Sequence, residues 1–389
     1  MHERQQALLP ELERDLESLS HTTGILPSQK IRELISDERI SSPYNIEEDQ
    51  VQPSSIDLRL GSIAYRMRAS FLPGPNGIVE KKLQDYVMTT IDLTRPTVLE
   101  RGCVYLVPLM ENLVLPSEVS AKANPKSSTG RLDIFTRLIC DGANEFERVP
   151  EGYKGPLYAE VVPRTFSVIV SEGARLNQLR LVRGSPLPSD ASHQRLDENE
   201  KLVYVDEDNH PAQIDDGLKI SLNLKGERKG DIIGYKAKRN TPAIDLLKRN
   251  FYDPEDFWDV IAPPKERTII LDPNDFYILF SKERVRIPPG FAAEMVAYDP
   301  SMGEFRVHYA GFFDPGFGYG NSDVKGTHAV LEVRSHEVPF VVEDGQVVGR
   351  LIYERLLDKS DIVYGVGIGS SYQGQGLALS KQFKRSTPY

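Results

Sequence analysis

The sequence predicts a mainly β protein built from two copies of one domain, with a short helical N-terminus. Three observations support this prediction: short alternating apolar runs over most of the chain, turn residues between them (29 Gly and 27 Pro), and a repeat at one fixed shift. At 389 residues, the chain is too long for one ordinary core and suits two domains of average size.

The repeat appears when the chain is shifted by 172 residues. This shift lays Glu111–Pro116 (ENLVLP) on Glu283–Pro288 (ERVRIP), and it lays Glu160 on Glu332. Similarity at a fixed shift decides the architecture before any local motif does, and here it indicates a duplicated domain. The two copies have kept different polar motifs. We therefore expect them to have divided the parts of one site between them.

The expected elements follow from the local patterns. Apolar residues three and four apart predict helices in residues 1–20 and 28–38, and alternating runs predict short strands in most of the remaining chain. Residues 183–217 are polar, acidic and weakly periodic, so we expect a linker or an insertion there. The expected organisation is an N-terminal domain at 1–182, this segment, and a C-terminal domain at 218–389.

Composition excludes several classes of protein. The formal net charge of −10 argues against a broad nucleic-acid-binding surface, and no run of eighteen apolar residues suggests a membrane span. The charged N-terminus does not fit a secretory signal, and Cys103 and Cys140 are too few for a disulfide framework. Closely spaced His and Cys ligands of a zinc site are also missing from the sequence. We expect a cytoplasmic protein that binds no nucleic acid, no membrane and no metal through protein ligands.

One polar run has the composition of a phosphate site. Lys126–Arg131 (KSSTGR) combines two cations with hydroxyl groups and a Gly. Cations, hydroxyls and backbone N–H groups can wrap a polyphosphate, and Gly permits its close approach. The order of a Walker A loop is missing, and the run taken alone fits a solvated turn better.

Carboxylates supply the other candidates. Glu160 and Glu332 each lie in an apolar, strand-like run, where burial would raise the pKa and make a general base. Alternation also places such residues on the solvent face of a strand. Asp314 opens an Asp-Pro-Gly-Phe turn and could accept a hydrogen bond from a sugar hydroxyl, although taken alone it fits an ordinary turn better. The segment Tyr372–Gly376 (YQGQG) fits either a flexible tail or a lid over a ligand, and taken alone it favours the tail.

Taken together, these motifs resemble the dCTP deaminase family, within the trimeric dUTPase superfamily. The matching segments, in family order, are Gln52–Gly61 (QPSSIDLRLG), Lys126–Arg131, Ala310–Phe317 (AGFFDPGF), Val330–Glu332, Tyr364 and Tyr372–Gln375. The first resembles an early strand motif, the second a phosphate motif with Lys where Arg is usual. The next two resemble the base-and-sugar pocket with its catalytic glutamate, and the last two resemble a segment that closes over the triphosphate.

The resemblance implies dUTPase-like domains, each a distorted β-barrel or jelly-roll. It implies hydrolytic deamination of dCTP to dUTP and ammonia in pyrimidine deoxynucleotide synthesis, with Mg²⁺ accompanying the triphosphate. Glu332 would activate water for metal-free attack on C4 of cytosine, with Ser127 and Arg131 as further catalytic residues. Asp314 would hold the 3′-hydroxyl. The residues implied in substrate binding are Lys126, Ser128, Ala310, Asp314, Val330, Tyr364, Tyr372 and Gln375.

The chain departs from the family in how its motifs are distributed. The usual family chain is one domain that holds every motif, whereas here the phosphate run occurs only in the first copy and Asp-Pro-Gly only in the second. We therefore expect one composite site, in which Lys126–Arg131 faces Asp314 and Glu332, and a degenerate site around Glu160. Ser371 also stands where the family usually places a lysine. Because family sites lie between adjacent domains, we expect a homo-oligomer, first of all a homotrimer.

Two other functions stay open from the sequence alone. One is a dUTP diphosphatase, or a bifunctional enzyme that continues to dUMP. The other is a catalytically silent regulator that binds nucleotide, which the divergence of both copies allows.

Overall fold

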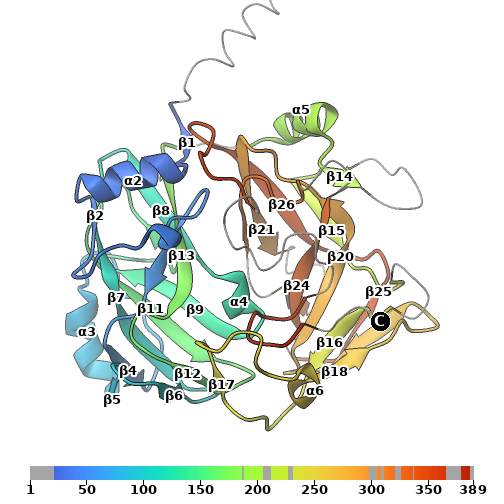
Figure 1. Cartoon of the computed structure of the whole chain (residues 1–389), viewed down its shortest axis with the longest axis horizontal. Helices are drawn as coiled ribbons and strands as arrows, with labels where there is room; N and C mark the ends of the chain where they lie inside the picture. The colour runs from blue at the N-terminus through green and yellow to red at the C-terminus, as the bar shows by residue number, and fades with distance from the viewer. Residues whose placement is uncertain are drawn as a thin grey trace, which may run out of the picture.

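The computed structural model describes residues 22–185, 188–204, 212–226, 231–297, 305–307, 311–319, 326–335, 337–364 and 378–385. Figure 1 shows two β-rich halves side by side, which confirms the predicted mainly β fold. The helix expected in residues 1–20 lies outside the described residues. Within them, no helix has the length and hydropathy needed to span a membrane.

Three sheets build the N-terminal half. The first has the order β1-β13-β8-β10, with β3 beside β13; the strands are β1 (Gly24–Ile25), β3 (Ile56–Arg59), β8 (Val119–Pro125), β10 (Arg148–Val149) and β13 (Arg175–Arg183). The second has the order β5-β4-β7-β11-β9, with β2 beside β7; the strands are β2 (Ile40–Ser41), β4 (Ile63–Met67), β5 (Val87–Asp92), β7 (Val104–Val114), β9 (Ile134–Cys140) and β11 (Lys154–Pro163). The third sheet pairs β6 (Thr97–Leu99) with β12 (Val168–Val170), and β12 with β17 (Ile244–Asp245) from the C-terminal half.

The C-terminal half repeats this plan. One sheet has the order β18-β16-β20-β24-β22, with β14 beside β20; the strands are β14 (Val203–Tyr204), β16 (Gly234–Ala237), β18 (Trp258–Ile261), β20 (Tyr277–Val285), β22 (Phe305–Val307) and β24 (Thr327–Ser335). Another has the order β15-β26-β21-β23; the strands are β15 (Leu218–Ser221), β21 (Phe291–Ala297), β23 (Phe312–Phe313) and β26 (Val347–Arg355). A two-stranded sheet joins β19 (Thr268–Leu271) to β25 (Phe340–Glu343).

The predicted duplication is confirmed by these bounds. A shift of 172 residues carries β8 onto β21 and β13 onto β26 without adjustment, and the sheet β5-β4-β7-β11-β9 corresponds strand by strand to β18-β16-β20-β24-β22. The shift could be found in the sequence because a strand that buries one face keeps its alternation of apolar residues.

In the described part of the chain, helices are few and short. They are α2 (Ser28–Ser36), α3 (Val79–Tyr86), α4 (Ser127–Gly130), α5 (Asp190–Glu200), α6 (Pro254–Phe257) and the 3₁₀ turn η1 (Glu48–Gln50). The helix predicted over residues 28–38 is α2, which buries Ile31 against the N-terminal core. Its apolar residues recur three and four apart, the spacing that makes one buried stripe.

The polar segment 183–217 contains the helix α5 and the strand β14. Ser189 caps α5 by accepting a hydrogen bond from the Ser192 N–H, and His193 is its buried residue. His193 accepts a hydrogen bond from the Tyr353 N–H in β26, while β14 pairs with β20. The helix α5 and the strand β14 therefore pack on the C-terminal half.

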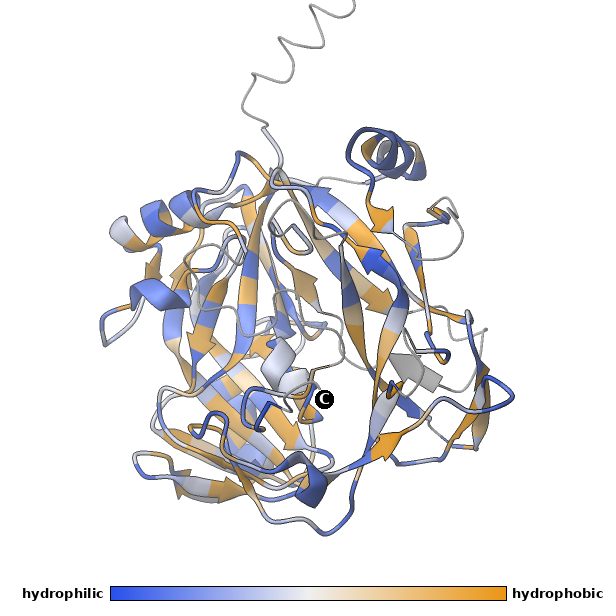
Figure 2. Cartoon of the chain, turned by 45° about the vertical axis from the view of Figure 1, so that its right-hand side comes forward, coloured by the Kyte–Doolittle hydropathy of each residue, from blue (hydrophilic) through white to orange (hydrophobic). Residues whose placement is uncertain are grey.

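The hydrophobic core of the N-terminal half extends across the boundary to residues of the C-terminal half, which also has a separate core of its own. The largest buried cluster contains most of the N-terminal core together with Tyr235, Trp258 and Phe276 from the C-terminal half. Phe166 of the N-terminal half packs edge-on against Phe257 and Trp258. Figure 2 shows apolar residues alternating with polar ones along the sheets of both halves. Burial of aromatic side chains at this boundary fixes how the halves face each other.

Candidate active site

The phosphate-type run lies at the boundary between the halves. Lys126 follows β8, and its N–H donates to the Leu176 carbonyl in the neighbouring strand, so the turn into α4 is tied to the sheet. Ser127 is exposed, but the next four residues, 128–131, are buried. Figure 1 shows α4 beside β24 of the other half. The interpretation of this run as an ordinary solvated turn is therefore wrong.

Glu332 in β24 faces this run. Its Oε1 lies 4.0 Å from Nε of Arg131, and both side chains are 9% exposed. Burial raises the pKa of Glu332 to about 7; Arg131 opposes this rise, and the nearby Asp133 adds to it. A carboxyl group with a pKa near neutrality can both accept and return a proton at physiological pH, as a general acid–base requires.

Asp314 is held by groups from the N-terminal half. It follows β23, and its Oδ1 accepts a hydrogen bond of 2.6 Å from Ser54 Oγ. The guanidinium of Arg180, a fully buried side chain in β13, lies 4.0 Å from the same oxygen and 3.9 Å from the Phe312 ring centroid. Arg180 also donates to the Ala293 and Phe313 carbonyls. Burial raises the pKa of Asp314.

The C-terminal segment returns to α4. Nη1 of Arg131 donates to the Ala378 carbonyl at 2.9 Å, and Ser380 Oγ donates to the Ser128 carbonyl at 2.8 Å. Tyr364, at the other end of the gap in the described chain, lies beside Asp314: its N–H donates to the Pro315 carbonyl, and its ring lies 5.4 Å from that of Phe317.

The structure thus brings most of the predicted site residues together from distant parts of the chain. Val330 shares a face of β24 with Glu332, because residues two apart along a strand point to the same side. Those that meet at the boundary are Lys126, Ser127, Ser128, Arg131, Asp314, Val330, Glu332 and Tyr364. Ala310, Tyr372 and Gln375 lie outside the described residues.

The equivalent glutamate of the first copy has a different environment. Glu160 in β11 is buried, and its Oε1 accepts a hydrogen bond of 3.0 Å from Nε of Arg137 in the adjacent strand β9. The Arg137 guanidinium lies 3.5 Å from the Phe146 ring centroid, which holds it in place. Glu160 is therefore engaged by an arginine of its own half, whereas Glu332 faces an arginine of the other half.

Four polar residues of the site carried no assigned role in the sequence analysis. Ser54 and Asp57 lie within the early strand motif, and Asp57 forms an ion pair with Lys126. Arg180 is one of several polar residues in β13, and the sequence pattern gave no sign of its contact with Asp314. Lys381 lies near Lys126 and Asp57, and burial, together with the neighbouring cations, lowers its pKa to about 8.

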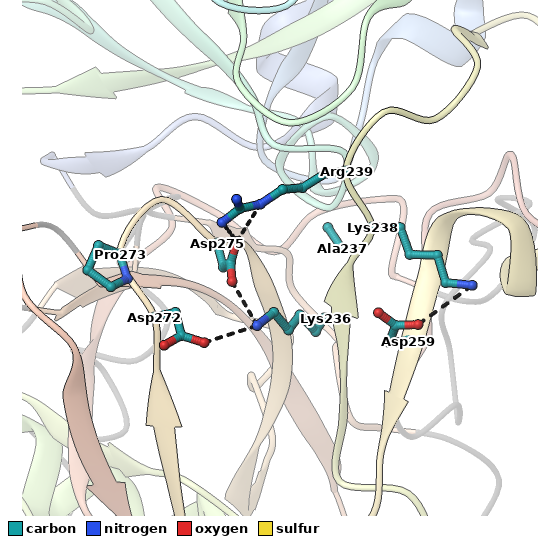
Figure 3. A pocket seen from close by; sticks show the side chains of 8 residues that line it. All are labelled: Lys236, Ala237, Lys238, Arg239, Asp259, Asp272, Pro273 and Asp275. Atoms are coloured by element: carbon teal, nitrogen blue, oxygen red, sulfur yellow. Dashed lines mark hydrogen bonds and ion pairs between the residues drawn. The ribbon is translucent and has the colours of Figure 1, made fainter.

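A pocket elsewhere in the C-terminal half is polar but internally neutralised (Figure 3). It is lined by Lys236, Ala237, Lys238, Arg239, Asp259, Asp272, Pro273 and Asp275. Lys236 Nζ lies 2.7 Å from Asp275 and 3.1 Å from Asp272, and Arg239 also pairs with Asp275. Because these cations and carboxylates neutralise each other, the pocket does not favour an anionic ligand.

Comparison with a solved structure defines the class to which this fold and site belong. The crystal structure of 2′-deoxycytidine 5′-triphosphate deaminase from Agrobacterium tumefaciens is 51% identical to the chain and superposes with a TM-score of 0.82. The match covers 86% of this chain and 100% of the other. The chain thus has the two-domain architecture of a deaminase of this class.

Family models and curated relatives agree. The models of the N-terminal and C-terminal domains of 2′-deoxycytidine 5′-triphosphate deaminase match residues 22–185 and 189–383. A "dCTP deaminase, dUMP-forming" from Methanosphaera stadtmanae is 31% identical over 139 residues, which is 36% of this chain and 68% of the relative. A "dCTP deaminase" from Haloarcula marismortui is 29% identical over 154 residues, 38% of this chain and 74% of the relative. The chain belongs to the dCTP deaminase family.

Proposed function

We propose that this protein hydrolytically deaminates dCTP to dUTP and ammonia in pyrimidine deoxynucleotide synthesis. One observation carries this assignment: the buried carboxyl of Glu332, with a pKa of about 7, lies opposite Arg131 of the other half. A buried base beside a cation can activate water and stabilise charge that develops in the transition state.

The proposed chemistry uses one water molecule and one carboxylate. Glu332 accepts a proton from the water as the water oxygen bonds to C4 of cytosine. Glu332 then returns that proton to the exocyclic nitrogen, the C4–N4 bond breaks, and ammonia leaves. The second water proton ends on ring nitrogen N3, so C4 becomes the carbonyl carbon of uracil. Arg131, 4.0 Å from Glu332, keeps the carboxylate oriented and polarises the site.

Substrate binding is proposed to follow the same division between the halves. Lys126, Ser127 and Ser128 supply a cation and hydroxyls for the triphosphate. The carboxylate of Asp314 accepts a hydrogen bond from the 3′-hydroxyl of deoxyribose, while the backbone near Val330 reads the base. Mg²⁺ would enter as part of the nucleotide substrate, bound to its phosphate oxygens.

The test is an assay of the purified full chain with dCTP, CTP and dUTP as separate substrates. We expect ammonia release from dCTP, a much lower rate with CTP, and none from dUTP. A chain that binds dCTP tightly without releasing ammonia would instead be a catalytically silent regulator, and this result would overturn the proposal.

A second activity is favoured by similarity to one relative, the "dCTP deaminase, dUMP-forming" of Methanosphaera stadtmanae. An enzyme of that kind releases pyrophosphate as well as ammonia. Equal amounts of pyrophosphate and ammonia from dCTP would establish a bifunctional enzyme, and pyrophosphate from dUTP alone would indicate a dUTP diphosphatase. Ammonia without pyrophosphate would leave deamination as the whole reaction.

We also propose that the chain acts in the cytoplasm and self-associates, with a homotrimer as the first expectation. Within the chain, the described site residues come from both halves, as the contacts of Glu332 with Arg131 and of Asp314 with Ser54 show. Sedimentation velocity of the purified protein distinguishes a monomer, a dimer and a trimer by mass.

A further inference from the structure

A second ion pair lies directly beside the pair formed by Arg131 and Glu332. Asp133 follows Arg131 by two residues, and Arg334 follows Glu332 by two residues. The Arg334 guanidinium forms hydrogen bonds with both carboxylate oxygens of Asp133, with Nε at 3.2 and 3.1 Å and Nη2 also in contact with Oδ2. Residues 131–133 of one half thus meet residues 332–334 of the other half through two successive pairs of charged side chains.

Both partners of this second pair are buried and held by further contacts. Asp133 is 1% exposed and Arg334 is 5% exposed. Thr165 donates to Asp133 Oδ2 at 2.6 Å and accepts from Arg334 Nη2 at 2.7 Å. Nη1 of Arg334 donates to the Asn274 carbonyl at 2.8 Å. The pair is therefore fixed in position by its neighbours.

The backbone on each side of the pair is also fixed. The Asp133 N–H donates to the Gly130 carbonyl, and the Asp133 carbonyl accepts from the Arg164 N–H at 2.9 Å. On the other side, Glu332 and Arg334 lie on one face of β24, since residues two apart on a strand share a face. Any displacement of Asp133 against Arg334 must therefore also displace Arg131 against Glu332.

The pair occurs only at the composite site. In the repeat, Val162 stands two residues after Glu160, where the second copy has Arg334 after Glu332. A buried ion pair is weak evidence for stability, because the desolvation of both charges offsets their attraction. Its restriction to one copy, next to Glu332, points to a role in geometry.

We propose that Asp133 and Arg334 are positioning residues that hold the two halves in the register at which Arg131 faces Glu332. This proposal rests on the assignment of Glu332 as the catalytic base. Displacement of a catalytic group by about 1 Å can cost about 10²-fold in rate, so a rigid joint beside the base has a direct effect on catalysis.

The test compares Arg334→Met, Asp133→Asn and the double variant with the wild-type chain, using dCTP as substrate. We expect each single variant to lower kcat by at least about tenfold with a smaller change in KM, because the base and Arg131 lose their register. The double variant should be no worse than the poorer single variant, since both changes break one joint.

A matched control is Arg137→Met, which breaks the buried ion pair with Glu160 in the other copy. It should lower the melting temperature while leaving kcat unchanged. Where Arg334→Met fails to fold, Thr165→Val removes only the hydroxyl that bridges Asp133 and Arg334, and kcat should again fall. The proposal would be overturned if the Asp133 and Arg334 variants have a lower melting temperature but keep the wild-type kcat. It would also be overturned if Arg137→Met lowers kcat as much as those variants do.

The pH profile separates positioning from loss of stability. The described charged groups that act on the pKa of Glu332 are Arg131 and Asp133, and Asp133 is paired with Arg334. The partner of Glu332 in β20 is the apolar Ile278. Asp133→Asn should move the acidic limb of kcat/KM to lower pH, whereas Arg334→Met, which leaves Asp133 unpaired, should move it to higher pH. A loss of stability alone predicts no shift of this limb. If Glu332→Gln keeps full activity, the assignment of Glu332 as the base is wrong. If Glu332→Gln is inactive while the Asp133 and Arg334 variants keep full activity, only the positioning role of this ion pair is wrong.

Discussion

Glu332 Oε1 lies 4.0 Å from Arg131 Nε, and these two residues come from different copies of a duplicated domain. Each copy alone contains only half of this arrangement. Glu160, the equivalent of Glu332, is engaged by Arg137 of its own half. The duplicated domain therefore places one glutamate opposite an arginine of the other half and the other glutamate in an ion pair within its own half.

Replacement of the two glutamates gives the most direct test of this asymmetry. We expect Glu332→Gln to lower kcat by about 10²–10⁴-fold, because an amide cannot accept the proton of water. Glu160→Gln is the matched control at the equivalent position of the repeat and should keep wild-type kcat. Ammonia release under saturating dCTP measures both variants, with circular dichroism to check that each is folded. Loss of activity in Glu160→Gln alone would reverse the assignment.

The activity should depend on pH through the carboxyl of Glu332. Its pKa is raised to about 7 by burial, so the carboxylate that accepts a proton is depleted below that pH. We expect kcat/KM for dCTP to rise with pH and to level off above a midpoint near about 7. Initial rates in overlapping buffers at constant ionic strength measure this profile. A midpoint close to the ordinary glutamate value of 4.5 would contradict it.

The same carboxyl should make stability depend on pH. A raised pKa means that the folded state binds a proton more tightly than the unfolded state does, so the free energy of unfolding falls as pH rises from about 4.5 to about 7. The shift from 4.5 to about 7 corresponds to a loss on the order of 3 kcal/mol. Urea unfolding at pH 5 and pH 8 should show this loss in the wild type. In Glu332→Gln the loss should be smaller by that amount.

Recognition of the 3′-hydroxyl should depend on Asp314 and on Arg180 behind it. We expect Asp314→Asn to lower kcat/KM for dCTP by about 10–100-fold, because a hydrogen bond to a charged acceptor is lost. The effect should be much smaller with 2′,3′-dideoxycytidine triphosphate, which has no 3′-hydroxyl. Arg180→Met should also reduce the preference for dCTP over the dideoxy nucleotide, because Asp314 would no longer be held in place by the guanidinium. Equal losses with both nucleotides would show that Asp314 does not contact this hydroxyl.

The C-terminal segment should contribute a cation to the triphosphate. Lys381 has a pKa of about 8 in the free protein, so its charge is lost as pH rises through that value. We expect KM for dCTP to rise above pH 8 in the wild type, and Lys381→Met to show a raised KM without this dependence. The deoxynucleoside monophosphate dCMP, used as a competitive inhibitor, is the comparison ligand, since its single phosphate should be less affected. An unchanged KM in Lys381→Met would exclude the contact.

Some of the site could be predicted from local sequence because its residues keep a fixed spacing. Lys126–Arg131 combines cations and hydroxyls in one short run, and Glu332 is a carboxylate among apolar strand residues. Arg180 could not be predicted in this way. It lies in a strand with alternating apolar residues, and only the packing of β13 against β21 and β23 places it beside Asp314.

Local patterns were enough to predict the duplication, the mainly β fold and the division of motifs between the copies, because periodicity and short runs are properties of neighbouring residues. The contact of Glu332 with an arginine of the other half, and that of Asp133 with Arg334, depend on tertiary packing. These contacts join residues 201 positions apart. Their geometry depends on how two cores pack together, which no local pattern specifies.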